Sequence, residues 1–172
     1  METNTIHAEA ETSTLVIPPA ALLEHWQGHR RLTRRMIEAF PEDRFFDYSI
    51  GGMRPFAAMV LELLSMADVG VDGILTGKWP TVEELDHHSG APAPTTREEI
   101  LRRWDNATAE IDRLWPQIPP GRFQEVDLVY GRYESPIYSA ILYWIDNEVH
   151  HRGQGYVYLR SLGIEPPAFW ER

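Results

Sequence analysis

Asn147 and His151 stand four residues apart near the end of a long C-terminal helical pattern. Because an α-helix advances about 100° per residue, their side chains point in nearly the same direction. Donor groups at this spacing on one helix converge on a small ion or polar ligand. The same sector of the helix otherwise carries core-type residues, namely Ala140, Trp144, Tyr158 and Leu162. A polar pair therefore interrupts a stripe that should face the protein interior.

Glu62 is a third polar residue at a position that should be buried. It lies in the middle of the run 56–67, which is apolar nearly all round and predicts a helix buried on several sides. A lone carboxylate in such a place is costly unless it is paired or bound to a metal. Inward side chains of facing helices meet inside a helical bundle, so Glu62 is the natural partner of Asn147 and His151.

The residues alone leave two interpretations of this trio open. A carboxylate, an amide oxygen and an imidazole form an open ligand set that suits a divalent ion such as zinc, nickel, manganese or iron. Such an ion would activate a bound water or thiol, or polarise a carbonyl. In the alternative, Glu62 accepts hydrogen bonds from Asn147 and His151 in a metal-free network that fixes the register of the helices.

Aromatic and polar residues around the trio predict a pocket for a small-molecule substrate. We expect its lining to include His29, Trp144, Gln154 and Tyr158. His25 and His29 are also four residues apart, but their charged neighbours indicate a solvated helix face rather than a ligand pair. His29 is included in the pocket lining because it also falls near the apolar stripe of Trp26 and Met36. His87 and His88 lie in a long irregular connection, and we expect them at the surface.

Apolar spacing predicts four helices, over residues 20–40, 54–75, 97–115 and 136–162. Thr96 with Glu99 is a capping box for the third helix, and Ser135 before Pro136 predicts the N-cap of the fourth. The connection over 119–134 is expected to be a loop or weakly extended. Without internal repeats or a strand-rich region, the sequence predicts an all-α four-helix bundle with long interhelical connections. We expect one domain over 15–172 and a flexible tail over 1–14.

Composition limits the function classes. The chain has 172 residues and a net charge of −10, with 26 acidic against 16 basic residues and no long basic run, which excludes nucleic acid as a partner. There is no cysteine, so disulfides, thiolate nucleophiles and Cys-ligated zinc are excluded. We expect a cytoplasmic protein without a membrane partner, because no apolar run approaches a membrane span and no signal-peptide pattern begins the chain.

The run His150-His151-Arg152-Gly153-Gln154, followed by Leu162-Gly163-Ile164-Glu165-Pro166-Pro167, closely resembles the C-terminal helix signature of the DinB/YfiT-like superfamily. Weaker similarity extends over most of residues 18–167 and includes Gly52-Met53-Arg54-Pro55-Phe56 before the second helix. The resemblance implies a four-helix bundle that forms a homodimer. It also implies a divalent metal held by three histidines, one from the second helix and two, four residues apart, from the last.

This chain departs from that ligand set at two of its three positions. His151 matches the last histidine, whereas Asn147 and Glu62 stand where the other two histidines are expected. The superfamily includes S-transferases that use bacillithiol or mycothiol and a mycothiol-dependent maleylpyruvate isomerase. The resemblance therefore adds a low-molecular-weight thiol to the expected cofactors.

Two functional hypotheses follow. In the first, the protein is a metal-dependent thiol S-transferase or hydrolase that acts on a small organic substrate in stress or detoxification, with Glu62, Asn147 and His151 holding the ion. In the second, it is a non-catalytic, stress-associated bundle with a degenerate metal site, which binds a small molecule or a protein partner. The family name refers to induction by DNA damage and not to DNA binding.

Overall fold

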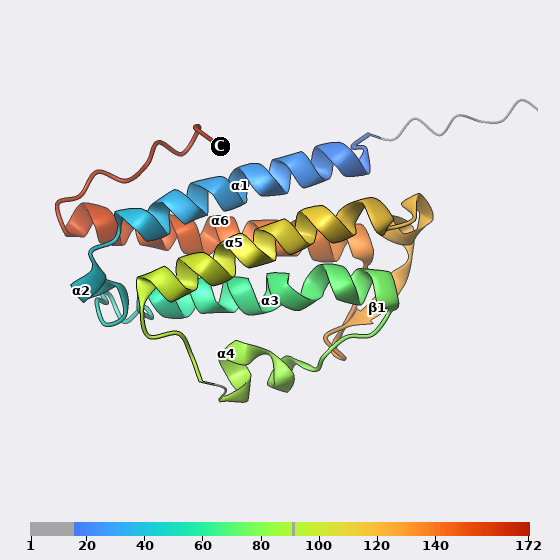
Figure 1. Cartoon of the computed structure of the whole chain (residues 1–172), viewed down its shortest axis with the longest axis horizontal. Coiled ribbons are helices and arrows are strands. Elements are labelled where there is room, and N and C mark those ends of the chain that lie inside the picture. The colour runs from blue at the N-terminus through green and yellow to red at the C-terminus, as the bar shows by residue number, and fades with distance from the viewer. Residues whose placement is uncertain (1–15, 91) are drawn as a thin grey trace, which may run out of the picture.

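The computed structural model describes residues 16–90 and 92–172. Its four long helices lie side by side in a bundle (Figure 1); they are α1 (Pro19–Ala39), α3 (Phe56–Thr76), α5 (Arg97–Leu114) and α6 (Ile137–Ser161). Helices α1 and α3 each pack mainly against α5 and α6. The predicted all-α four-helix bundle is confirmed, while the predicted tail over 1–14 lies outside the described residues.

The connections between the long helices carry short elements of their own. The first connection contains α2 (Glu42–Phe45), and the second contains η1 (Val82–Glu84) and α4 (Asp86–Ser89). Helix α4 packs against α3 on the side away from α1 (Figure 1). The third connection contains η2 (Trp115–Gln117) and η3 (Pro120–Gln124) before the hairpin. These connections therefore cover one side of α3 and lie at both ends of the bundle (Figure 1).

An antiparallel hairpin precedes the last helix, where the sequence predicted a loop or weakly extended chain. Strand β1 (Val126–Val129) pairs with β2 (Tyr133–Pro136). The turn between them contains Tyr130 and Gly131, both at positive φ. The hairpin closes the end of the bundle where α6 begins.

Helix starts follow the sequence prediction at one site and depart from it at another. The Thr96 hydroxyl accepts a hydrogen bond from the Glu99 backbone N–H at 3.2 Å, which confirms the predicted N-cap of α5. The predicted cap at Ser135 is wrong, because Ser135 is still paired with Asp127 in the hairpin. Pro136 is the N-cap residue of α6 and makes no side-chain cap.

Two apolar clusters fill the bundle, one at each end. The cluster near the hairpin contains Trp26 and Trp144, and the cluster at the opposite end contains Phe56 and Trp104. Buried polar residues fall between the two clusters along the chain, at positions 27–33 of α1, 62–65 of α3 and 147–152 of α6. A polar belt therefore crosses the middle of the bundle.

Glycine allows the closest approach between α6 and α3. A Cβ added at Gly155 would lie 2.5 Å from the Phe56 ring, and one added at Gly70 would lie 2.6 Å from the Trp144 ring. Both distances are far below van der Waals contact, so no larger residue fits without movement. None of the described helices is long and apolar enough to cross a membrane.

Candidate functional site

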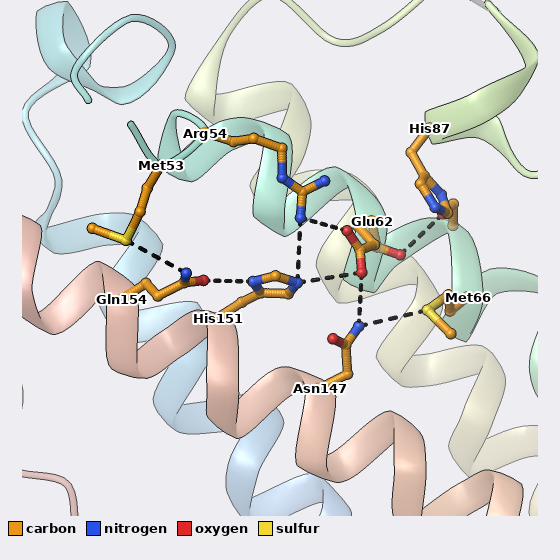
Figure 2. A network of polar contacts seen from close by, with 9 residues as sticks. Met53, Arg54, Glu62, Met66, His87, Asn147, His151 and Gln154 are labelled. Carbon is orange, nitrogen blue, oxygen red and sulfur yellow. Dashed lines mark hydrogen bonds and ion pairs between the residues drawn. The ribbon is translucent and has the colours of Figure 1, made fainter. Parts of the chain in front are cut away.

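Glu62, Asn147 and His151 meet at the interface of α3 and α6 (Figure 2). Oε1 of Glu62 accepts a hydrogen bond from the Asn147 amide at 3.1 Å and lies 3.2 Å from Nε2 of His151. The side chains of Glu62 and His151 are mostly buried. The helical spacing thus brought the three side chains together as expected, and their role in metal binding stays a prediction.

Arg54 completes the surroundings of the Glu62 carboxylate. Its Nη2 atom lies 2.6 Å from Oε2 of Glu62 and 3.5 Å from Nε2 of His151 (Figure 2). The hydrogen bond from His151 holds the pKa of Glu62 well below its usual range, and those from Arg54 and Asn147 add to it against the opposing effect of burial. Glu62 is therefore an ionised carboxylate with three hydrogen-bonding partners.

Gln154 fixes the orientation of the His151 ring. Its Oε1 atom lies 2.7 Å from Nδ1 of His151, and its amide nitrogen contacts the sulfur of Met53 at 3.5 Å (Figure 2). Because the Gln154 oxygen can only accept, Nδ1 of His151 donates to it and the other nitrogen, Nε2, faces Glu62; donation from Nε2 to Glu62 as well requires the imidazolium form of the ring. Gln154 acts on the site through His151.

These donors do not fit a resident divalent ion well. The trio offers one carboxylate, and both oxygens of that carboxylate already accept hydrogen bonds. The guanidinium of Arg54 supplies positive charge at the place where an ion would supply it, and a dication there would face a like charge at close range. Within the described part of the chain, no three His, Cys, Asp or Glu side chains form a group that could hold a metal.

A cavity of about 410 Å³ adjoins Glu62 and lies between α3, α6, the hairpin and the segment around α4. Its walls are formed by Glu62, Met66, Val82, Leu85, His87, His88, Val129, Tyr130, Tyr133, Ser135, Ser139, Ala140, Tyr143 and Trp144. Tyr133 and Tyr143 are exposed at the rim, whereas Tyr130 and Trp144 are buried. Trp144 is thus a wall residue, while Gln154, His29 and Tyr158 lie outside these walls.

His29 lies on α1, away from the cavity. Its Nδ1 atom accepts a hydrogen bond from Arg152 at 2.8 Å, and its Nε2 atom lies 3.2 Å from Nε2 of His25. Burial, followed by the charge of Arg152, lowers the pKa of His29 to about 4. His25 is exposed, as the predicted solvated helix face requires. The same prediction is wrong for His29, which is buried because α1 packs against α6 at this point.

Tyr158 is a core residue that contacts the backbone of Arg54. It is fully buried, and its ring packs edge-on against Tyr48 and Phe40. Its hydroxyl donates to the backbone carbonyl of Arg54 at 2.8 Å. Tyr158 thereby fixes the chain segment that carries the guanidinium partner of Glu62.

His87 is a wall residue that sequence reasoning placed at the surface. It is half-buried, and its Nδ1 atom forms a hydrogen bond with the Ser65 hydroxyl (Figure 2). The pKa of His87 is lowered, first by burial and then by the neighbouring His88. Its position depends on the packing of α4 against α3, and no sequence spacing indicates that packing.

Glu148 and Arg152 form a second buried polar group, on the α1 side of α6. Glu148 is 2% exposed and accepts a hydrogen bond from the Thr33 hydroxyl at 2.6 Å. Arg152 lies 3.6 Å from the same carboxylate oxygen. Burial raises the pKa of Glu148. The four-residue spacing of Glu148 and Arg152 was the available sequence signal for this pair.

The fold and the site define a four-helix bundle with a polar network between two of its helices and a cavity beside that network. The DinB family model matches residues 6–172, and the chain belongs to this family. A DinB-like protein from Bacillus cereus ATCC 10987 is similar in fold, with a TM-score of 0.69 and 15% identity over 88% of this chain and 97% of that one. A DinB-like protein from Bacillus subtilis has a TM-score of 0.66 and 16% identity over 88% and 99% of the two chains. No curated protein matches at a significant level.

Proposed function

We propose that this DinB-family protein binds a small organic molecule in the cavity beside Glu62. The observation that carries the proposal is the cavity of about 410 Å³, which has mainly apolar and aromatic walls and an ionised carboxylate at one side. Ligand pockets in proteins span roughly 300–1,000 Å³ and combine such walls with a few convergent polar groups. The cavity has the size and the chemistry of a small-molecule site.

The polar side of the cavity is preorganised. Asn147 and His151 hold one oxygen of Glu62 and Arg54 holds the other, so the carboxylate is fixed before any ligand arrives. A fixed polar group binds a ligand without a further loss of side-chain freedom. The network therefore supports recognition as its role.

The contacts of Ser65 and Ser135 argue against either of these two serines as a nucleophile. Ser65 bonds to His87 but is 3% exposed, and its hydroxyl also donates to the Glu62 backbone carbonyl. Ser135 lies in the cavity wall and donates to the Pro136 carbonyl. A serine nucleophile needs both access to the substrate and a base within hydrogen-bond reach. Neither of these serines meets both conditions.

Filling the cavity tests this proposal. Ala140 is a buried wall residue, so Ala140→Leu places additional carbons inside the cavity. We expect the wild-type protein to bind 2-(2-naphthyl)ethanol saturably in calorimetric titration, with a Kd below about 1 mM, and Ala140→Leu to weaken binding at least about tenfold. Ala21→Leu, at an exposed position of α1, is the matched control and should bind as the wild type does. Equal affinity in Ala140→Leu would place the ligand elsewhere.

A metal-dependent thiol S-transferase or hydrolase is the second candidate function. One observation favours it: Gln154 holds His151 so that Nε2 faces Glu62, an orientation that outer hydrogen bonds commonly give to metal-binding histidines. In that case Glu62, Asn147 and His151 would hold the ion and a low-molecular-weight thiol would be the cosubstrate. The metal content of the purified protein separates the two candidates.

A further inference from the structure

The cavity beside Glu62 carries a single fixed charge, and that charge is negative. Among the described residues that line it, none is Lys or Arg, and Glu62 is the only Asp or Glu. Burial and the neighbouring His88 lower the pKa of His87 in the wall, which disfavours a positive charge on this ring. An anionic ligand would therefore meet a carboxylate and no fixed cation.

The Glu62 carboxylate can accept one more hydrogen bond. An ionised carboxylate offers about four lone-pair sites. Asn147 and the imidazolium form of His151 use the two sites of Oε1, and Arg54 uses one site of Oε2. The remaining site of Oε2 suits an N–H donor from a ligand, and a positively charged donor gives the stronger bond.

Aromatic rings make up much of the remaining wall. Tyr130, Tyr133, Tyr143 and Trp144 all line the cavity. The Tyr130 hydroxyl donates to the Met66 carbonyl at 3.2 Å, so its ring is fixed in place. The pKa of Tyr143 is raised by burial and then by the negative charge of Glu62, which places its hydroxyl within the field of that carboxylate. Aromatic faces attract cations, most strongly where water is excluded.

We infer that the ligand of this cavity is an organic monocation, an ammonium or alkylammonium group on an apolar or aromatic body. The ammonium group lies at Glu62 among the tyrosine rings, and the body fills the part of the cavity lined by Met66, Leu85 and Val129. This inference rests on the proposed binding function and names the class of ligand. The net charge of −10 also concentrates cations around the protein.

Arg54 limits the strength of this preference. It contacts Glu62 from outside the cavity and lines a neighbouring hollow instead. Its guanidinium, together with the His151 ring on the other carboxylate oxygen, partly balances the charge of Glu62 and repels a cation bound there. We therefore expect the cation to bind about tenfold more tightly than a neutral ligand of the same shape.

Three ligands with one aromatic body test the inference in calorimetric titration with the full chain at pH 7. They are 2-(2-naphthyl)ethylamine, which is a cation, 2-(2-naphthyl)ethanol, which is neutral, and 3-(2-naphthyl)propionate, which is an anion. The inference predicts the tightest binding for the amine and the weakest for the carboxylate. If the alcohol or the carboxylate binds most tightly, the inference that the ligand is a cation is wrong, while the proposed binding of a small organic molecule stands. If none of the three binds, both proposals are overturned.

Two variants locate the origin of the preference. Glu62→Gln should reduce the ratio of the amine and alcohol affinities from about tenfold to about one. Tyr143→Leu should lower the amine affinity severalfold with a smaller effect on the alcohol, and it supplies the test if Glu62→Gln fails to fold. Tyr138→Leu is the matched control, because Tyr138 is exposed on the same helix outside the cavity walls. An unchanged ratio in both cavity variants would contradict the inference.

Discussion

Nε2 of His151 and Oε1 of Glu62 lie 3.2 Å apart across the interface of α3 and α6, although the residues are 89 positions apart in sequence. Apolar clusters lie on both sides of this contact, so it sits in the middle of the bundle. A buried hydrogen-bonded pair forms in a single register, in addition to the register favoured by the close packing of Gly155 against Phe56 and of Gly70 against Trp144. The pair therefore specifies how α3 and α6 align, and it also fixes the carboxylate beside the cavity.

Removal of the Glu62 carboxylate should destabilise the fold. Glu62→Ala leaves His151, Asn147 and Arg54 without their shared acceptor, and a buried polar group without a partner costs about 1–3 kcal/mol. Urea denaturation should show this loss. Glu83→Ala, at an exposed position, should change the free energy of unfolding by less than about 0.5 kcal/mol. If Glu62→Ala is as stable as the wild type, the network does not hold the helices together.

Two glycines on α6 should respond in opposite directions to alanine. Gly155→Ala forces a Cβ to within 2.5 Å of the Phe56 ring, and overpacking of this kind costs about 1–3 kcal/mol. Gly153 has no atom within 4 Å of its added Cβ, so Gly153→Ala should stabilise the helix by about 0.5–1 kcal/mol. Thermal unfolding of the two variants measures both effects. The same shift in both would show that α3 and α6 do not approach as closely as described.

His29 should make the stability of the protein depend on pH. Its pKa is lowered to about 4 in the fold, chiefly by burial and then by Arg152, from an unfolded value of 6.5. Between these values the unfolded chain binds more protons than the folded chain, so the stabilisation is present above about pH 6.5 and is lost toward pH 4. We expect a loss of up to about 3 kcal/mol from this group.

Denaturation at a series of pH values checks this prediction. His29→Gln keeps a polar partner for Arg152 and removes the titrating ring, so the loss of stability between pH 6.5 and 4 should become smaller. His150→Gln, which replaces an exposed histidine on α6, should keep the wild-type pH dependence. Identical pH profiles for both variants would assign the acid sensitivity to other groups.

Helical spacing was sufficient to predict the bundle and the meeting of Glu62 with Asn147 and His151. Each of these residues is polar at a position where the periodicity demands an apolar side chain, and such a departure is visible without a structure. Arg54 and His87 carry no comparable signal. Their places at the site depend on how the chain before α3 and the short helix α4 fold back onto the bundle.

The hairpin and the start of α6 show a different limit. Ser135 before Pro136 has the pattern of a helix cap, yet strand pairing extends to Pro136 and delays the helix to Ile137. A usable signal was present, because the short runs 126–129 and 133–136 are separated by three residues that include Gly131. The local sequence pattern alone does not decide between a helix that is capped by Ser135 and a strand that continues to Pro136, because the same residues suit both structures.

Arg54, Asn147 and His151 hold the Glu62 carboxylate, and we predict that no metal ion binds beside it. Elemental analysis of protein purified without an affinity tag, after incubation with zinc, nickel, manganese and iron and then desalting, tests this prediction most directly. We expect far less than one ion per chain and a thermal unfolding temperature that does not change with a chelator. Near-stoichiometric metal in the wild type that is lost in Glu62→Ala and His151→Ala would contradict this prediction and support the metal-dependent alternative.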